Sequence, residues 1–447
     1  MRRLFGSLVV LAHVRGQRRA AFLARHRIEA LRDARVRRIV AHAARTVPYY
    51  RDLFARERID PRDIRGVREL DALPLLDREA VRRHPERFLS TSRRARGALP
   101  YLTSGTTGTP LTVHHDRRSV LANIGWGERE RAPLIELCGG VFRPREVYIG
   151  YDTSNFGKVL AFYGRATRLP RPKRTTVSMT SPIDDIVATI NRMRPDILTA
   201  YGSFLDMFLR AVSARGLEMY RPRAIVYMGE TLPVDRRLWI ERELGVPVLS
   251  RYCAVESFKI GYFCAERTGF HLHDDLCHVR VLRDDGRDAA AGELGEVVIS
   301  NLVNHATVLL NYPMGDLAAI AASPCPCGRH HRLLSEIQGR VEDVIPLPDG
   351  RFVHPRAVWA VFKEDRDVVE YQLVQHDLQH FELRLVTAGE DAFPAARDRA
   401  IAELRGLLGS GARFDASRHA ELGRTQRQAT GKFRAVESRV AAAVSGA

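Results

Sequence analysis

A run of glycines and small, hydroxyl-bearing residues between Leu102 and Pro110 has the composition of an anion-binding loop. Every residue in it is a glycine, a serine or a threonine: Thr103, Ser104, Gly105, Thr106, Thr107, Gly108 and Thr109. Glycine adopts backbone angles that other residues avoid, so such a loop can turn tightly and point N–H groups at a phosphate, while the hydroxyls add donors. The alternative is a polar surface turn. No lysine follows Gly108, which excludes the Gly-x-x-x-x-Gly-Lys-[Ser/Thr] phosphate loop.

Further polar residues fall where a parallel sheet would bring them to one edge. Strand-like segments at 196–201, 224–228 and 246–252 alternate with helical segments at 204–214 and 234–244, which predicts parallel strands joined by crossover helices. Ligands of such sheets bind at the carboxyl ends of the strands. Those ends carry Tyr201, Gly202, Ser203 (also a candidate N-cap), Gly229, Glu230, Thr231, Tyr252, Cys253, Ala254, Val255 and Glu256.

The elements that must position these residues divide the chain into three parts. Residues 1–100 are expected to be helical, with a long helix over 17–46 and Asp77 as the N-cap of a short one. Residues 101–338 form the core that holds the alternating segments. Short strands are expected in it at 295–301 and 308–312.

A small C-terminal domain is expected at 344–447, after a hinge at 339–343. Its predicted elements are helices at 356–363 and 395–408 and strands at 368–374, 381–386 and 412–416. The expected fold class is therefore α/β: a large N-terminal domain with parallel α/β sheet layers and a helical segment at its start, followed by a small α+β domain.

Three cysteines and one histidine suggest a metal site. Cys264 precedes His271, and Cys325 and Cys327 follow some sixty residues later in Cys-Pro-Cys-Gly. Three thiolates with one imidazole make a tetrahedral set suited to structural Zn²⁺. The rival fourth ligands are His273, His330 and His331, and Cys277 is a spare thiol. The alternative is a group of buried, inert cysteines beside a surface histidine.

Composition excludes several function classes. The 447 residues are 45% apolar and carry a net charge of +17, almost all of it from scattered arginines, so we expect no nucleic-acid partner. Lysine is rare, at positions 158, 173, 259, 363 and 432. The apolar run Leu8–Val14 is too short to span a bilayer and no cleavage site follows it, so we expect a cytoplasmic chain without a transmembrane segment. The alternative that a helix in this region touches a membrane surface stays open.

The motifs together resemble those of the adenylate-forming enzymes, the superfamily of acyl-CoA ligases, luciferases and adenylation domains. Thr-Ser-Gly-Thr-Thr-Gly-Thr-Pro matches its phosphate-binding signature, and the other motifs follow in the family order. The match runs from about residue 35 to about residue 437 and is to the phenylacetate–CoA ligase-like branch, of which the Val-Pro-Tyr-Tyr and Leu-Pro-Leu-Leu-Asp segments are typical. In this superfamily ATP and a carboxylic acid give an acyl-adenylate and pyrophosphate, and a nucleophile then takes the acyl group.

The resemblance implies how ATP and Mg²⁺ would be bound. Residues 103–109, with Thr106 as a catalytic hydroxyl, would hold the β- and γ-phosphates, and Gly229–Thr231 would lie along the adenine. Tyr252 would stack on the base and Glu256 would bind Mg²⁺, which favours carboxylate oxygen. Asp316 would accept hydrogen bonds from the two ribose hydroxyls. Arg340 would touch ribose or phosphate.

Catalysis and acid binding follow from the same resemblance. Lys432, in Thr-Gly-Lys-Phe, would bridge the carboxylate and the α-phosphate as charge develops on them, and the small domain would rotate between the two half-reactions. The acid would be aryl or otherwise bulky and apolar, in a pocket with walls drawn from Tyr151, Tyr201, Gly202, Phe204, Tyr227 and Phe258. Members of this branch carry Gly-x-His and Cys-Pro-Cys-Gly elements too, which favours the zinc interpretation.

Some positions depart from the family pattern and leave the acceptor open. Thr109 stands where many relatives carry lysine, and Cys253 and Val255 replace the usual glycine and threonine before Glu256. Residues 346–350 replace the glycine-containing hairpin that CoA ligases press against pantetheine. The acceptor is therefore CoA or, alternatively, an amine or a carrier-protein thiol. A non-catalytic nucleotide-binding relative and a homodimer are further alternatives.

Overall fold

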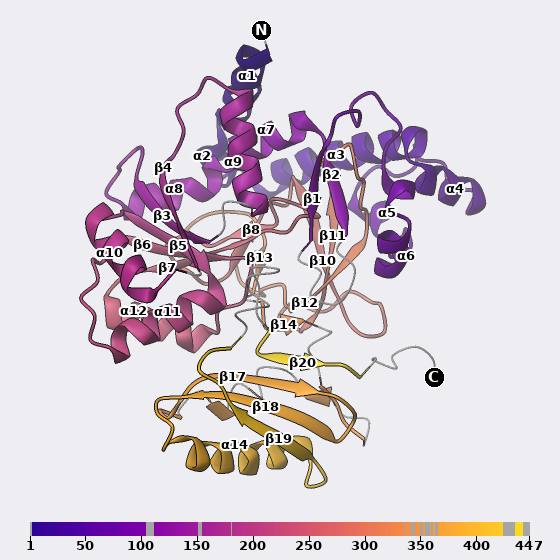
Figure 1. The fold of residues 1–447 in the computed structure, drawn as a ribbon. Coiled ribbons are helices and arrows are strands. Elements are labelled where there is room, and N and C mark those ends of the chain that lie inside the picture. The colour runs from indigo at the N-terminus through magenta and orange to yellow at the C-terminus, as the bar shows by residue number, and fades with distance from the viewer. Residues whose placement is uncertain are drawn as a thin grey trace.

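A computed structural model gives the arrangement of the chain. The described residues are 2–103, 111–150, 154–179, 181–335, 337–340, 345–348, 352–353, 358, 361–362, 365–422 and 434–440. The fold class is α/β as predicted, with several sheets covered by helices (Figure 1).

The largest sheet has eight strands in the order β13-β9-β8-β7-β6-β5-β3-β4. They are β3 (Arg145–Gly150), β4 (Lys173–Ser178), β5 (Ile197–Tyr201), β6 (Ala224–Met228), β7 (Val248–Tyr252), β8 (Gly261–Tyr262), β9 (Phe270–Leu272) and β13 (Leu333–Leu334). The first five in chain order are parallel, and β8, β9 and β13 extend the sheet in antiparallel fashion. Every residue of β6 is buried, as expected for a strand with both faces covered.

Crossover helices join the parallel strands and fix the edge at which the strands end. They are α9 (Asn155–Ala166), α10 (Ile183–Met193), α11 (Gly202–Ala214) and α12 (Val234–Leu244). The apolar sides of α10, α11 and α12 bury against the sheet in one hydrophobic cluster. Tyr201 is the N-cap residue of α11, so the helix begins at Gly202 and the prediction of Ser203 as the N-cap is wrong.

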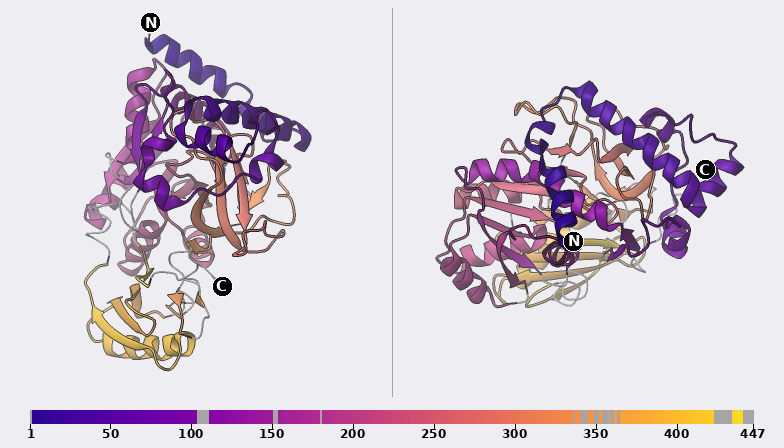
Figure 2. Two further views of the ribbon diagram at one scale, coloured as in Figure 1. Left: turned by 90° about the vertical axis from the view of Figure 1, so that its right-hand side faces the viewer. Right: turned by 90° about the horizontal axis from the view of Figure 1, so that it is seen from above.

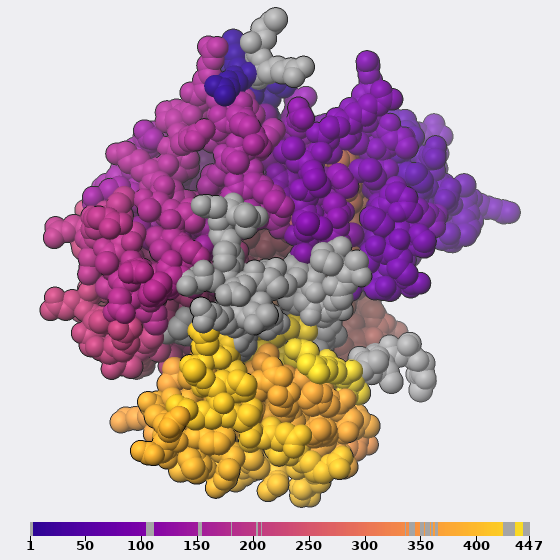
Figure 3. Space-filling model, viewed as in Figure 1, coloured from indigo at the N-terminus to yellow at the C-terminus, as the bar shows by residue number. Residues whose placement is uncertain are grey.

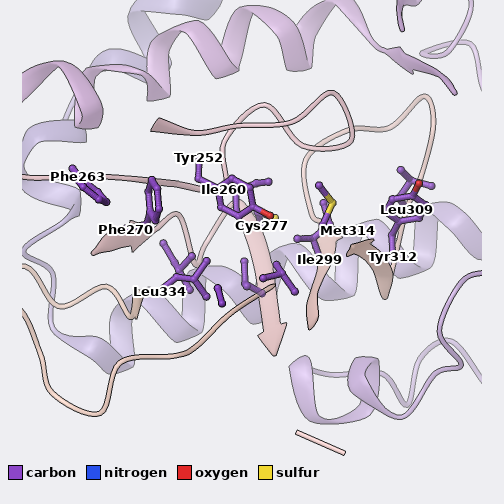
Figure 4. Packing of buried hydrophobic residues seen from close by; sticks show 14 of the residues in the cluster. Tyr252, Ile260, Phe263, Phe270, Cys277, Ile299, Leu309, Tyr312, Met314 and Leu334 are labelled. Atoms are coloured by element: carbon purple, nitrogen blue, oxygen red, sulfur yellow. The ribbon is translucent and has the colours of Figure 1, made fainter. Parts of the chain in front are cut away.

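A second, antiparallel sheet in the order β10-β11-β12-β14 packs beside the first. Its strands are β10 (Cys277–Leu282), β11 (Gly295–Asn301), β12 (Tyr312–Ala318) and β14 (Gly339–Arg340), and a separate pair is β1 (Leu99–Leu102) with β2 (Thr112–His115). Residues of both sheets share one buried cluster, in which Tyr252 and Phe270 of the first sheet pack with Cys277, Ile299 and Met314 of the second (Figure 4). This common core holds the end of β7 close to β12.

Helices cover the beginning of the chain. They are α1 (Arg2–Val14), α2 (Gln17–Ala20), α3 (Arg25–Thr46), α4 (Pro48–Arg56), α5 (Val67–Asp71), α6 (Arg78–Arg83), the 3₁₀ turn η1 (Pro85–Phe88), α7 (Arg117–Trp126) and α8 (Glu128–Leu137). The Asp77 side chain accepts a hydrogen bond from the Glu79 N–H at 2.8 Å, which confirms the predicted N-cap of α6.

Two elements differ from their predicted bounds, because residues distant in the sequence form hydrogen bonds with their backbone groups. The helix expected over 17–46 is broken at 21–24, where the carbonyl oxygens of Ala21 and Leu23 contact the backbone N–H and the imidazole of His330. The strand expected at 308–312 begins only at Tyr312. Before it, the Val308 N–H donates to the Phe88 carbonyl. Tertiary contacts override the local pattern in both cases.

The C-terminal residues form a third sheet, in the order β19-β18-β17-β20. Its strands are β17 (Val368–Gln375), β18 (His380–Thr387), β19 (Arg413–Arg418) and β20 (Val436–Ser438). The helix α14 (Phe393–Leu408) covers it, and β15 (Ile345–Pro346) and β16 (Phe352–Val353) form a hairpin. This lobe lies at the end of the molecule opposite α1 (Figures 1, 2 and 3). The Arg210 guanidinium of α11 donates to the carbonyls of Val368 and Val369 at 3.3 and 2.8 Å and so links the lobe to the large sheet.

Candidate active site and metal centre

One cavity of about 1800 Å³ runs along the carboxyl edge of the parallel strands and reaches the C-terminal lobe. Many of the residues singled out from the sequence line it: Thr103, Tyr201, Tyr227, Gly229, Glu230, Thr231, Tyr252, Glu256, Phe258 and Asp316. These residues come from separate elements, and the parallel topology brings their strand ends to a common edge as expected.

Tyr252 and Asp316 are hydrogen-bonded to each other at the wall of this cavity. The Tyr252 hydroxyl donates to Asp316 Oδ2 at 2.6 Å, and both side chains are buried. Tyr252 ends β7 and Asp316 lies on β12, so the shared core sets their distance. Arg340 pairs with Asp316 in the register of β12 and β14, which places the backbones of the two residues side by side. An aromatic ring next to a buried carboxylate suits a ligand with a flat ring and vicinal hydroxyls.

The turn after β6 needs its glycine. Gly229 has φ of 77°, and a Cβ there would lie 3.1 Å from the Tyr201 ring. Gly202, at the start of α11, would place a Cβ 2.7 Å from the Glu230 carbonyl oxygen. Only glycine fits either position, so the segment 229–231 can lie flat along the cavity wall with its backbone exposed to a ligand.

The base of the glycine–threonine loop is closed by two hydrogen bonds. The Thr103 N–H donates to the Leu111 carbonyl, and the Leu111 N–H donates to Thr103 Oγ1, each at 2.9 Å. Together with the β1–β2 pairing, this anchors both ends of the loop at the cavity. The remaining loop residues, Ser104–Thr109, lie outside the described residues, as do Tyr151 and Lys432.

Aromatic side chains give the cavity an apolar part. Phe258 stacks on His115 with ring centroids 3.9 Å apart, and the Tyr148 hydroxyl contacts that of Tyr201 at 3.5 Å. Phe204 differs from the prediction. It is buried in the core under the parallel strands, stacked on Phe208, because its position on α11 points toward the sheet. Gly202 likewise shapes the wall through its contact with Glu230 rather than by lining the cavity itself.

A buried charge cluster in the cavity wall was not foreseen. The Glu130 carboxylate accepts from Lys259 Nζ at 2.7 Å, lies 3.1 Å from His273 Nε2, and faces Arg251 Nε at 3.6 Å. Burial alone would raise the pKa of Glu130, but Lys259, His273 and Arg251 lower it, so the carboxylate is ionised. The rarity of lysine in this chain is the signal that could have pointed to Lys259.

The four metal-ligand candidates meet at one place beside the large sheet. One ligand atom from each of Cys264, His271, Cys325 and Cys327 lies within 4.8 Å of the others. Cys264 and Cys325 Sγ are 3.6 Å apart, and Cys327 Sγ is 3.3 Å from His271 Nε2. Zinc bound tetrahedrally by sulfur and nitrogen requires ligand–ligand edges of about 3.3–3.8 Å. The two measured edges fit that requirement.

The protein environment also suits a divalent cation. Burial lowers the pKa of His271 to about 3, so its ring is neutral and keeps a lone pair for a metal. Of the rival histidines, His273 contacts Glu130 and His330 contacts the Leu23 carbonyl. Cys277 is buried on β10, outside this group. The β9–β13 pairing, with His271 opposite Leu333, brings the histidine to the cysteines.

Comparison with known proteins agrees with this geometry. No protein-family model matches the chain. The chain is 28% identical over 360 residues to a phenylacetate–coenzyme A ligase of Thermus thermophilus, and the alignment covers 79% of each chain. It is 25% identical over 332 residues to a phenylacetate–coenzyme A ligase of Pseudomonas putida, and that alignment covers 71% of this chain and 72% of the other.

Solved structures show the same fold. A 2-hydroxyisobutyryl-CoA ligase in the postadenylation state superposes with a TM-score of 0.71 at 17% identity, over 90% of this chain and 88% of the other. An anthranilate CoA ligase, AuaEII, superposes with a TM-score of 0.51 at 16% identity, over 74% and 65%. By its fold, its site and its sequence similarity, the chain resembles the adenylate-forming superfamily, a class of AMP-forming ligases. Within that class it is similar to phenylacetate–CoA ligases, at 24–28% identity.

Proposed function

We propose that the chain is an ATP-dependent ligase that activates a carboxylic acid as an acyl-adenylate, releases pyrophosphate and transfers the acyl group to CoA. The observation that supports this most directly is the convergence of Tyr252, Asp316, Glu256 and the segment 229–231 on one cavity. That arrangement supplies a ring to stack on a base, a carboxylate for ribose hydroxyls and a flat backbone wall.

The assigned roles follow from these positions. Adenine lies between Tyr252 and the segment 229–231, the ribose hydroxyls donate to Asp316, and Arg340 contacts the ribose or a phosphate. The loop 103–109 binds the β- and γ-phosphates through N–H groups and the hydroxyl of Thr106. Glu256 holds Mg²⁺, which supplies charge neutralisation at the phosphates. Lys432 stabilises the charge that develops between the carboxylate and the α-phosphate.

The acid is aryl or otherwise bulky. The rings of Tyr148, Tyr201, Tyr227 and Phe258 line the cavity and favour an apolar body. CoA is favoured as the acceptor because the curated relatives are CoA ligases, and because residues 345–346 and 352–353 pair as a hairpin despite the altered sequence between them. An amine or a carrier-protein thiol is the alternative acceptor.

Acid-dependent exchange of labelled pyrophosphate into ATP tests the first half-reaction. We expect exchange with an arylacetic or aryl carboxylic acid and none without acid. Subsequent addition of CoA should consume its thiol in proportion to AMP formed, whereas amine acceptors should give no amide. The absence of exchange across a broad panel of acids would contradict the ligase assignment, and amide without thioester would replace CoA by an amine.

A pair of substitutions tests nucleotide binding. Tyr252→Phe removes the hydroxyl that donates to Asp316 while keeping the ring, and we expect ATP to bind about tenfold more weakly. Asp316→Asn removes the charged acceptor and should weaken binding about 100-fold. Isothermal titration calorimetry measures both. Tyr148→Phe removes a phenol from the same cavity without touching either residue and should leave ATP affinity unchanged. Equal effects of all three variants would refute the nucleotide roles.

A further inference from the structure

The first helix packs closely against the protein through one face. A Cβ at Gly6 would clash with the Ala166 carbonyl oxygen, so the backbone of α1 closely approaches the backbone at the end of α9. Val9 and Val10 are buried with Leu121 and Tyr163. Gly125 of α7 likewise leaves no room for a Cβ, which would meet His13 at 2.7 Å. These contacts bury the inner face of α1 against the rest of the protein.

The outer face of α1 is apolar as well, and it is exposed. Leu4, Phe5, Leu8 and Leu11 are 53%, 61%, 58% and 50% exposed. At about 100° per residue these four fall within an arc of about 120°, so they form one stripe rather than scattered surface positions. Single exposed leucines are ordinary in soluble proteins, but a contiguous stripe along a helix marks an interaction surface.

The sequence around this stripe is strongly basic. Residues 1–28 contain no aspartate or glutamate, and the first acidic residue is Glu29. The arginines in that segment are Arg2, Arg3, Arg15, Arg18, Arg19, Arg25 and Arg27. An apolar stripe flanked by arginines is typical of helices that lie in the interface of an anionic membrane. Helix α1 is also at the end of the molecule away from the C-terminal lobe, so the lobe does not obstruct it (Figures 1 and 2).

We propose that α1 docks on the surface of an anionic phospholipid bilayer. Leu4, Phe5, Leu8 and Leu11 insert at the level of the acyl-chain boundary, and the exposed Arg15 and Arg19 contact lipid phosphates, whereas Arg18 and Arg25 form ion pairs with Glu128 and Asp274 within the protein. The helix lies on the bilayer and does not cross it, since none of the helices in the described part of the chain has the length and apolarity of a transmembrane span. Val10, Leu11 and Val14 also line the large cavity, so docking brings that end of the cavity to the lipid.

Vesicle co-sedimentation of the full chain tests the proposal without ATP or acid, so its result is independent of the ligase assignment. We expect binding to vesicles of phosphatidylcholine with about one third phosphatidylglycerol, at least tenfold weaker binding to pure phosphatidylcholine, and weaker binding as NaCl is raised. The double variant Phe5→Ser/Leu8→Ser should bind at least tenfold more weakly, and Arg15→Gln/Arg19→Gln should lose the preference for anionic lipid.

Leu378→Ser is the matched control, because Leu378 is 42% exposed but lies in the C-terminal lobe, and it should bind as the unaltered chain does. Circular dichroism checks that each variant is folded, and we expect unaltered spectra because the substituted side chains are exposed. Binding that is absent, or equal in Phe5→Ser/Leu8→Ser and the unaltered chain, overturns the proposal. Concentration-dependent dimerisation without lipid that Phe5→Ser/Leu8→Ser abolishes also overturns it, since the stripe would then contact a second copy.

Discussion

Lys432→Ala should lower acid-dependent pyrophosphate exchange by about 10²–10³-fold, while thioester formation from a preformed acyl-adenylate changes little. Lys432 itself lies outside the described residues, but Arg434, two residues later, is buried and lines the cavity together with Val436. An ammonium group that acts only as charge develops in the adenylation transition state affects that half-reaction alone.

The control for Lys432→Ala is Lys158→Ala, which removes an exposed ammonium group from α9 at another part of the cavity. That variant should keep both half-reactions within about threefold, a change of well under 1 kcal/mol in activation free energy. Exchange that survives in Lys432→Ala would remove the lysine from the mechanism. An equal loss of both half-reactions would indicate damage to the fold rather than to one step.

Loss of the proposed zinc ion should lower the stability of the folded chain more than any other change considered. The chain as purified should contain about one zinc ion, and Cys325→Ser should contain much less, because a neutral serine hydroxyl is a far poorer ligand for Zn²⁺ than the thiolate it replaces. Even a loss of about 3 kcal/mol, a small part of what structural zinc supplies, lowers the apparent transition temperature by about 3–4 °C in a chain of this length. Elemental analysis and differential scanning calorimetry measure the two effects.

Cys277→Ala serves as the matched control for Cys325→Ser. Cys277 is equally a buried cysteine, but its thiol lies outside the cluster. Its substitution can lower stability through lost packing, yet the zinc content should stay at about one ion per chain. Zinc that is absent from the unaltered chain, or retained in Cys325→Ser, would contradict the metal assignment.

The elements that were predicted well are those specified by neighbouring residues. Strand β6 and helix α12 have the bounds read from the sequence, because local periodicity and the turn residues between them define a crossover unit. Strand β11, in the antiparallel sheet, also has the predicted bounds. The same local order brought Tyr252 and Glu256 to the edge where the structure places them. Family resemblance added Asp316, whose position depends on the register of an antiparallel sheet that periodicity alone does not give.

The features that were missed depend on contacts between distant segments. His330 interrupts the first long helix from 307 residues away, and Glu130 meets Lys259 across 129 positions. Phe204 was assigned to the pocket because it follows a strand end, but the rotation of α11 turns it into the core. His271, in contrast, was predicted as the fourth ligand of the cysteine cluster, and the pairing of β9 with β13 explains how it comes to lie beside the cysteines.

That pairing has a mechanical consequence. After Cys327 the chain adds β13 to the large sheet and then β14 to the second sheet, where β14 pairs with β12 at Asp316. One short segment therefore joins the cysteine–histidine cluster to the strand that carries the cavity carboxylate. The proposed zinc ion would tether the start of this segment and thereby help to hold β14 beside β12.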